Sequence, residues 1–409
     1  MSEHRPRPLD GVRVISLGAF VAGNWAGQAL VELGAEVVKV EAHDRPEVLR
    51  TPAYAFGQPY TEPSGIPQTV MYGTMSRGTR GLSIDLQHEA ARPVFRELAK
   101  RAHVVVENIA GPTLARWGCA YPDLARANPS LVWLSLSGYG RTGPRANYLA
   151  YATNISSYTG LTDMWGLPHP MQSDYVSAQT GVVAVLAGLA EAERSGTGVY
   201  LDVAQIDAMT PLMTPLLVDP LVNGRDTVRH ENRVPGAWFS GVFPARGHDA
   251  WLAIELEDAE DWQVLCRVLD RPDLSTADPD EAAARDGTLE AALVEWLAER
   301  SPHTATHLLQ KAGLAAGTVQ TPEDIWRDPQ LRTRGFIVEL PQPDYGTINY
   351  PGSPYRLSAT PGRIDRGGPR LGEHTNAVLQ EWLGLDEAEL ASLASSGAIY
   401  QAPEEGRAP

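Results

Sequence analysis

Asp174 is the residue in this sequence best placed for covalent chemistry. It stands among small and uncharged residues in the segment MQSDYVSAQTG (171–181), directly before the apolar run VVAVLAGLA (182–190). A carboxylate that is shielded from water can attack an activated carbonyl carbon and form an anhydride. An aspartate before a helix is also a common N-cap, worth on the order of 1 kcal/mol. On local sequence alone, capping by Asp174 or by its neighbour Ser173 is the commoner explanation, and both interpretations stay open.

The overall charge restricts the ligands that the protein can take. The 34 basic residues face 50 acidic ones, which gives a net charge of −16 and repels nucleic acids and anionic membranes. The cysteines, Cys119 and Cys266, are far apart, so neither a disulfide framework nor a zinc site is indicated. The N-terminus lacks the apolar core of a signal peptide, and no stretch approaches the roughly 18 apolar residues of a spanning helix. We therefore expect a cytoplasmic protein without a metal.

The first 140 residues alternate between strand and helix patterns. Short β-rich runs predict strands at 12–18, 36–41, 103–109 and 130–140, and helical spacing predicts helices at 24–34, 88–102 and 121–127. Repeated alternation of this kind indicates an α/β fold with a parallel sheet covered on both faces. Ligands of such sheets bind beyond the carboxyl ends of the strands.

The predicted carboxyl ends of the strands are the segments 18–23, 107–112 and 137–144. They are rich in Gly, Ala, Ser and Asn, which lets the backbone approach a ligand closely and leaves N–H groups free for anions. The dinucleotide signature G-x-G-x-x-G is missing after the first strand, which argues against a nicotinamide or flavin enzyme.

The pattern changes after about residue 220. Residues 241–256 predict a hairpin with its turn at 245–249, and helical segments follow at 258–269 and 287–300, then at HTATHLLQKAG. These elements indicate a small α+β domain with its own core. The remaining predicted elements are strands at 336–341 and 346–352 and helices at 373–384 and 386–396.

Five segments together resemble the class III CoA-transferases. They are 8–41, 104–118, 173–208, 352–361 and 370–379, and they occur in the family's order along nearly the whole chain. The resemblance implies an interlocked homodimer, each chain with a large Rossmann-like CoA-binding domain and a small domain. We place the first part of the large domain at 1–215, a linker at 216–240, the small α+β domain at 241–325, and a segment that returns to the large domain at 326–409.

The resemblance also implies the reaction. The family moves CoA from an acyl-CoA donor to a free carboxylic acid acceptor through covalent intermediates on one aspartate, and the matching residue here is Asp174. No cofactor is permanently bound, because the CoA thioester is itself a substrate. By the same resemblance Val21 and Ala22 line the CoA, and Arg116 contacts its phosphates unless it is only a solvated cation at a helix end. The other CoA-binding positions are Ile84, Asp85, Leu86, Gln87, Asn108, Ile109, Ala110, Ser137, Gly138, Tyr139 and Gly140.

The sequence departs from the formyl-CoA-type pattern of this family at several of these positions. Val21 replaces a glutamine, Ala42 replaces an arginine, and Gln87 and Ser137 replace lysines. Fewer fixed cations therefore face the phosphates; the candidates to compensate are Arg77, Arg80 and Arg141. The glycine-rich lid is also absent, and we expect residues 231–241 to occupy the equivalent region. We infer an acyl substrate larger or more apolar than formate or oxalate.

Two other functions remain open. An α-methylacyl-CoA racemase would need a histidine after the strand at 130–140, but residues 131–168 contain none and His169 is the nearest candidate. A CoA-binding protein without turnover would be consistent with the thinned set of cations. Further titratable residues, interpreted as structural or solvated, are Glu41, His43, His230 and His374. The segment GEHT (372–375) predicts the start of a helix, with Glu373 or Thr375 as its cap.

Overall fold

The computed structural model describes residues 6–50, 69–165, 171–224, 232–343, 345–362 and 364–403. The chain forms two compact units: a large one from residues before 225 and after 332, and a small one from the residues between them. The segment predicted at 241–325 lies within the small unit.

A seven-stranded sheet forms the centre of the large unit, in the order β12-β3-β2-β1-β4-β5-β6. Its strands are β1 (Arg13–Leu17), β2 (Glu36–Glu41), β3 (Arg80–Ile84), β4 (Val104–Glu107), β5 (Val132–Ser137), β6 (Tyr200–Ala204) and β12 (Ile399–Tyr400). All neighbouring strands are parallel except the pair of β12 and β3. The predicted α/β class with a parallel sheet is confirmed.

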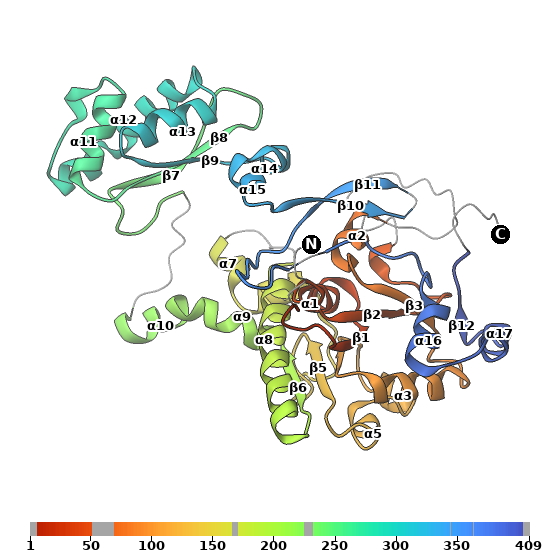
Figure 1. Ribbon diagram of the computed structural model, residues 1–409. Coiled ribbons are helices and arrows are strands. Elements are labelled where there is room, and N and C mark those ends of the chain that lie inside the picture. Colours follow the sequence, from red (N-terminus) through yellow and green to blue (C-terminus); the bar gives the residue numbers. More distant parts are fainter. Residues whose placement is uncertain are drawn as a thin grey trace. The chain divides into compact units, whose positions relative to one another are not determined.

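Helices cover both faces of this sheet (Figure 1). Alternate residues of a strand point to opposite faces, so Val14 of β1 packs with α1 (Phe20–Glu32) and α8 (Gln172–Ser195). Ile15 packs on the other face with α3 (Ala91–Arg101), α16 (Thr375–Leu383) and α17 (Glu387–Ser395). The C-terminal segment thus completes the large unit, and the predicted helices at 24–34, 88–102, 373–384 and 386–396 are confirmed within a few residues.

The remaining elements of the large unit are short. They are η1 (Val48–Arg50), α2 (Val70–Ser76), α4 (Thr113–Arg116), α5 (Tyr121–Leu124), α6 (Ala152–Tyr158), α7 (Leu161–Trp165), α9 (Gln205–Met209), η3 (Thr210–Met213), α10 (Thr214–Asn223) and the antiparallel pair β10 (Ile337–Gln342) and β11 (Gly346–Pro351).

Helix α8 needs a correction to the sequence analysis. By length and composition it is the one helix in the described ranges that could cross a membrane, although no such stretch was expected. One such helix is weak evidence, because the central helix of a soluble protein passes the same test. Here α8 packs on α1 and β5 through Ala178, Val182 and Val185. We therefore interpret α8 as a packing helix of the large unit.

The small unit has an antiparallel sheet in the order β7-β8-β9. Its elements are β7 (Phe239–Pro244), β8 (Trp251–Leu256), α11 (Ala259–Val268), η4 (Pro272–Leu274), α12 (Pro279–Ala298), α13 (Pro302–Lys311) and β9 (Ala315–Thr318); α14 (Pro322–Arg327) and α15 (Pro329–Thr333) follow. The predicted hairpin is confirmed. Helix α12 begins before the predicted residue 287, because Asp278 caps it by accepting from the backbone N–H groups of Asp280 and Glu281.

Candidate active site

Asp174 lies in the first turn of α8 and does not cap it. The N-cap position belongs to Met171, which has a left-handed φ of 70° and makes no side-chain cap bond. The Oδ1 atom of Asp174 instead accepts a hydrogen bond of 2.6 Å from Nε2 of Gln205, the first residue of α9. The buried hydroxyl of Ser173 has no hydrogen-bond partner among the described residues. The capping interpretation is therefore wrong for both Asp174 and Ser173.

The surroundings of Asp174 favour the neutral acid more than an exposed site would. Burial raises the pKa of Asp174 to about 6, and the hydrogen bond from Gln205 partly opposes this rise. Asp174 is still mainly ionised at neutral pH. Because its pKa is raised, the ionised carboxylate of Asp174 is more basic than that of a solvated aspartate.

A cavity of about 590 Å³ opens beside Asp174. It lies beyond the carboxyl ends of β1, β4 and β5, next to the point where the strand order reverses between β1 and β4. The structure brings seven of the predicted site residues together here, namely Val21, Asn108, Ile109, Ala110, Ser137, Gly138 and Asp174. The other lining residues are Ala19, Phe20, Leu49, Met71, Leu136, Leu149, Ala150, Tyr151, Ala152, Thr153, Met171 and Gln205.

A second cavity, of about 340 Å³, adjoins the first. The two share Ala19, Phe20 and Ile109 as lining residues, so they meet over the start of α1. The predicted segment 84–87 lines this second cavity at the end of β3. An elongated ligand could therefore reach from Asp174 to residues 84–87 along one edge of the sheet.

Arg45 supplies a cation to the second cavity, and the sequence analysis missed it. Its guanidinium donates to Oε1 of Gln87 over 2.9 Å and to Oδ1 of Asp85 over 2.7 Å, and its side chain stays 49% exposed. Arg45 stands three residues after Ala42, where the family pattern has its lost arginine. That spacing alone gave no reason to expect the contact with Gln87, because the loop after β2 has to fold back to make it.

The three arginines proposed from sequence as replacement cations are engaged elsewhere. Arg77 is fully buried and pairs with Glu32 over 2.8 Å. Arg80 pairs with Glu36 over 2.7 Å at the far ends of the strands. Arg141 donates to Glu107 over 2.8 Å and to Ser135 over 2.7 Å. None of them lines either cavity, so the structure gives no support to their role as replacement cations.

Four predicted CoA-binding residues line neither cavity. Ala22 is buried in the contact of α1 with the sheet. Arg116 is exposed on α4, with one hydrogen bond of 3.2 Å to Thr113. The ring of Tyr139 packs edge-on against two other tyrosines, and Gly140 has a φ of 83° that favours glycine. Their assignment to CoA stays a prediction.

Polar side chains hold the start of α1 in place between the two cavities. The amide of Asn108 bonds to both backbone groups of Ala19, with each bond 2.6 Å long. Glu47 accepts from the backbone N–H of Phe20 over 2.9 Å and pairs with the buried Lys39 over 3.0 Å. Phe20 itself has a φ of 54°, which is costly for a residue with a Cβ atom. These contacts therefore fix a strained turn that lines both cavities.

The other titratable candidates are structural. Glu41 accepts two hydrogen bonds of 2.8 Å from the buried Arg50. Burial alone would raise the pKa of Glu41, but the charge and hydrogen bonds of Arg50, together with the charge of Lys39, lower it to about 2. His374 accepts from the N–H of Gly81, and burial lowers its pKa to about 4. His43 stacks on Tyr400.

The helix at GEHT begins as predicted, but neither proposed residue makes a cap bond to it. His374 holds the N-cap position, but its side chain makes no hydrogen bond to the first turn of the helix. Thr375 instead links Ser83 to Tyr400, and Glu373 accepts from the N–H of Arg370.

Some candidates cannot be placed beside Asp174. His169, His230 and residue 231 lie outside the described residues. Residues 232–241 belong to the small unit, so their comparison with a lid stays a prediction.

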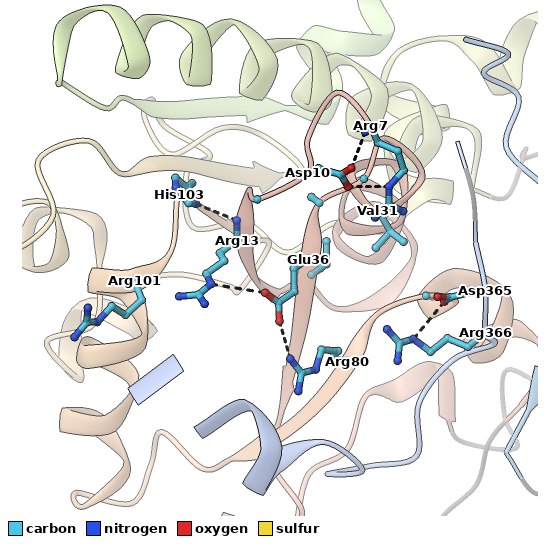
Figure 2. A pocket seen from close by; sticks show the side chains of 15 residues that line it. Arg7, Asp10, Arg13, Val31, Glu36, Arg80, Arg101, His103, Asp365 and Arg366 are labelled. Carbon is cyan, nitrogen blue, oxygen red and sulfur yellow. Dashed lines mark hydrogen bonds and ion pairs between the residues drawn. The ribbon is translucent and has the colours of Figure 1, made fainter. Parts of the chain in front are cut away.

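A further cavity, of about 540 Å³, lies at the opposite ends of the strands (Figure 2). Five arginines line it, but its carboxylates pair with them: Asp10 with Arg7, Glu36 with Arg80 and Asp365 with Arg366. Of the residues that the sequence analysis named for CoA, only the candidate cation Arg80 lies there. Across the described ranges, no group of three or more His, Cys, Asp or Glu side chains could hold a metal ion.

The sequence matches the family model described as CoA-transferase family III over residues 9–375. It is 28% identical to the succinyl-CoA–D-citramalate CoA-transferase of Chloroflexus aurantiacus, over 97% of this chain and 100% of that protein. It is 31% identical to the succinate–glutarate CoA-transferase of Agrobacterium fabrum, over 92% of this chain and 96% of that protein. A crystal structure of a CAIB/BAIF family protein from Brucella suis aligns with a TM-score of 0.81 at 28% identity, over 92% of this chain and 100% of that chain.

Proposed function

The chain belongs to CoA-transferase family III and is an acyl-CoA:carboxylate CoA-transferase, and we propose that it works through covalent intermediates on Asp174. The observation that carries this proposal is the setting of Asp174. Its carboxylate faces a largely apolar cavity, Gln205 holds one oxygen, and burial raises its pKa to about 6. A partly desolvated carboxylate of this kind is a better nucleophile than one in water.

The proposed reaction needs one carboxylate and no net proton transfer. An oxygen of Asp174 attacks the thioester carbonyl carbon, the C–S bond breaks, and CoA leaves as the thiolate. The thiolate then attacks the Asp174 carbonyl carbon of the mixed anhydride, which releases the donor acid and leaves a CoA thioester on Asp174. The acceptor carboxylate attacks this thioester and expels the thiolate. The thiolate finally attacks the acceptor carbonyl carbon, so the new acyl-CoA forms and Asp174 is restored.

The two adjoining cavities suit the two ends of a CoA thioester. The thioester would lie at Asp174, the arm would pass over Ala19 and Phe20, and the phosphates would face Arg45 near residues 84–87. Arg guanidinium groups bind phosphate oxygens through directed hydrogen bonds. Gln205 would keep the Asp174 carboxylate oriented while the other oxygen attacks.

We extend the proposal to the assembly and its setting. The active enzyme is an interlocked homodimer in the cytoplasm, with an acyl-CoA and a free carboxylic acid as its small-molecule partners and no permanently bound cofactor. This part rests on the family resemblance and on the acidic net charge of −16.

Hydroxylamine trapping tests the mechanism. The protein is incubated with a panel of acyl-CoAs and hydroxylamine, which converts activated carboxyl groups to stable hydroxamates, and its peptides are mapped by mass spectrometry. We expect a hydroxamate at Asp174 that depends on acyl-CoA and is absent in Asp174→Asn. Acyl-CoA turnover without any modified Asp174 would contradict the covalent route. Exchange of the α-proton in deuterated water, without CoA transfer, would instead indicate the racemase.

A further inference from the structure

One wall of the Asp174 cavity is built from hydrocarbon and sulfur. Val21, Leu49, Met71 and Met171 line it and belong to one hydrophobic cluster, which also includes Tyr175 beside Asp174. Met171 precedes Asp174 by about one turn of α8, so the cluster lies against the reacting carboxylate. An acyl group on Asp174 that extends toward this cluster would meet apolar atoms.

Apart from Asp174, the polar side chains that line the cavity are uncharged, and two of them are already hydrogen-bonded. Asn108 uses its amide oxygen and nitrogen on the backbone of Ala19, and Gln205 donates to Asp174. Ser137 also lines the cavity, and its buried hydroxyl is uncharged and has no partner among the described residues. Neutral groups of this kind can orient a thioester carbonyl oxygen. They do not neutralise a second carboxylate.

The charge in the cavity points the same way. Within the described part of the lining, Asp174 is the one side chain charged at neutral pH. The shift of its pKa reflects burial and the Gln205 hydrogen bond, with no contribution from a neighbouring cation. The free carboxylate of a dicarboxylic acyl group would be desolvated beside a second negative charge, and no side chain in the described lining would compensate it with a positive one.

The names of the relatives point to a substrate class that this cavity does not suit. Citramalate, glutarate and succinate, after which two of them are named, are dicarboxylic acids. We propose that this enzyme instead carries acyl groups that end in an uncharged hydrocarbon, so that its substrates are apolar monocarboxylic acids and their CoA thioesters. This inference rests on the proposed function, because it requires the acyl group to be bound at Asp174.

Matched pairs of acyl-CoAs test the substrate class. Each acyl-CoA is mixed with its own isotopically labelled acid, and label entering the thioester is followed by mass spectrometry. Butanoyl-CoA is paired with succinyl-CoA, and pentanoyl-CoA with glutaryl-CoA, so that members of a pair differ only in the terminal carboxylate. We expect kcat/KM for exchange to favour the monocarboxylic member by about 100-fold or more, since burying an unpaired charge costs several kcal/mol.

Variants that introduce a positive charge locate the residues that discriminate between the two substrate classes. Met71→Arg places a cation in the apolar wall, and Leu149→Arg places one at a position that is 73% exposed and therefore tolerant of a charge. We expect either variant to raise the glutaryl-to-pentanoyl ratio of kcat/KM by about 10-fold or more. Met71→Gln, which is polar but uncharged, should leave that ratio near the wild-type value.

The outcomes separate the two proposals. Wild-type exchange that is equal for both members of a pair, or faster for the dicarboxylic one, would overturn the apolar substrate class and leave CoA transfer intact. If no acyl-CoA in the panel supports exchange and no hydroxamate forms at Asp174, the proposed function itself is contradicted.

Discussion

The hydrogen bond from Gln205 favours the ionised form of Asp174, the proposed nucleophile, against the larger effect of burial. Because the pKa of Asp174 is about 6, kcat/KM should fall as the pH drops through about 6. Gln205→Leu removes a hydrogen bond that favours the anion, so we expect the acidic limb to move to higher pH. Gln179→Leu is the matched control, since Gln179 lies on α8 like Asp174 but accepts a hydrogen bond from the hydroxyl of Tyr355. An acidic limb that does not move in Gln205→Leu would argue against this role.

Asp174 should also reduce stability at neutral pH. Its pKa in the folded protein is raised from 3.8 to about 6, so the folded state binds the proton more tightly than the unfolded state. Unfolding free energy therefore decreases as the pH rises from about 4 to about 6 and the penalty is complete above that range. We expect Asp174→Asn to be more stable by on the order of 1 to 3 kcal/mol at pH 8 and to lose this advantage below about pH 4. Urea unfolding of both proteins across this range measures the difference.

Arg45 should be the main cation for a CoA phosphate group. Its donors already face the second cavity, and a charge-assisted hydrogen bond to phosphate is worth roughly 1.5 to 3 kcal/mol. We expect Arg45→Ala to weaken CoA binding by about 10-fold or more in calorimetry. Arg126→Ala, an exposed arginine that lines neither cavity, is the control.

The ligand series then shows which phosphate is involved. If Arg45 binds the 3′-phosphate, dephospho-CoA should bind wild type and Arg45→Ala equally. If it binds the diphosphate, both ligands should lose affinity. Unchanged binding of both ligands would contradict the assignment.

At the scale of elements, the sequence predicts a strand best when apolar residues dominate it. Strands β1 (RVISL) and β2 (EVVKVE) are dominated by Val, Ile and Leu, because both of their faces are covered, and the sequence predicts them. Strands β3 (RGLSI) and β6 (YLDVA) were missed because they mix glycine or polar residues into short segments. The role of Gln205 was also missed. It becomes a partner of Asp174 only because β6 delivers the start of α9 beside α8, and no local pattern reports that contact.

The element that follows β2 is held by a buried ion pair. Glu41 and Arg50 join the end of β2 to η1, and the hydroxyl of Tyr72 in α2 donates to Glu41 over 2.9 Å. Glu41→Gln leaves the Arg50 charge uncompensated, so we expect a loss of about 3 to 5 kcal/mol in unfolding free energy at pH 7. Glu97→Gln, at an exposed pair with Lys100, should change it by less than about 1 kcal/mol.

The pH dependence of this loss has a definite sign. The pKa of Glu41 is lowered from 4.5 to about 2 in the folded protein, so its contribution is complete above about pH 4.5 and is lost as the pH falls toward 2. The two unfolding curves should therefore converge at acid pH. A difference that is the same at pH 7 and pH 3 would contradict the ion-pair explanation.

At the scale of the whole molecule, one surface of the single chain is poorly suited to water. On α10 the side chains of Leu217, Val218, Leu221 and Val222 are 49, 42, 85 and 72% exposed, and Leu212 in η3 is 54% exposed. A contiguous apolar segment of this kind usually marks a surface that another chain covers. In the proposed homodimer, the second subunit would cover this apolar segment. An interlocked dimer would also dissociate very slowly, because its subunits cannot separate without extensive unfolding.

We therefore expect light scattering to show a dimer at nanomolar concentration, and mixed batches of isotopically heavy and light dimers to form no hybrid over hours under native conditions. Hybrids should form only after denaturation and refolding. Leu221→Glu with Val222→Glu places charges on the apolar segment of α10, and we expect it to yield monomer or aggregate. Val70→Glu, at a residue that is 66% exposed on α2, is the matched control and should stay dimeric. Hybrid formation within minutes between native dimers would be compatible with a homodimer. It would contradict interlocking, because exchange at that rate requires subunits that separate while folded.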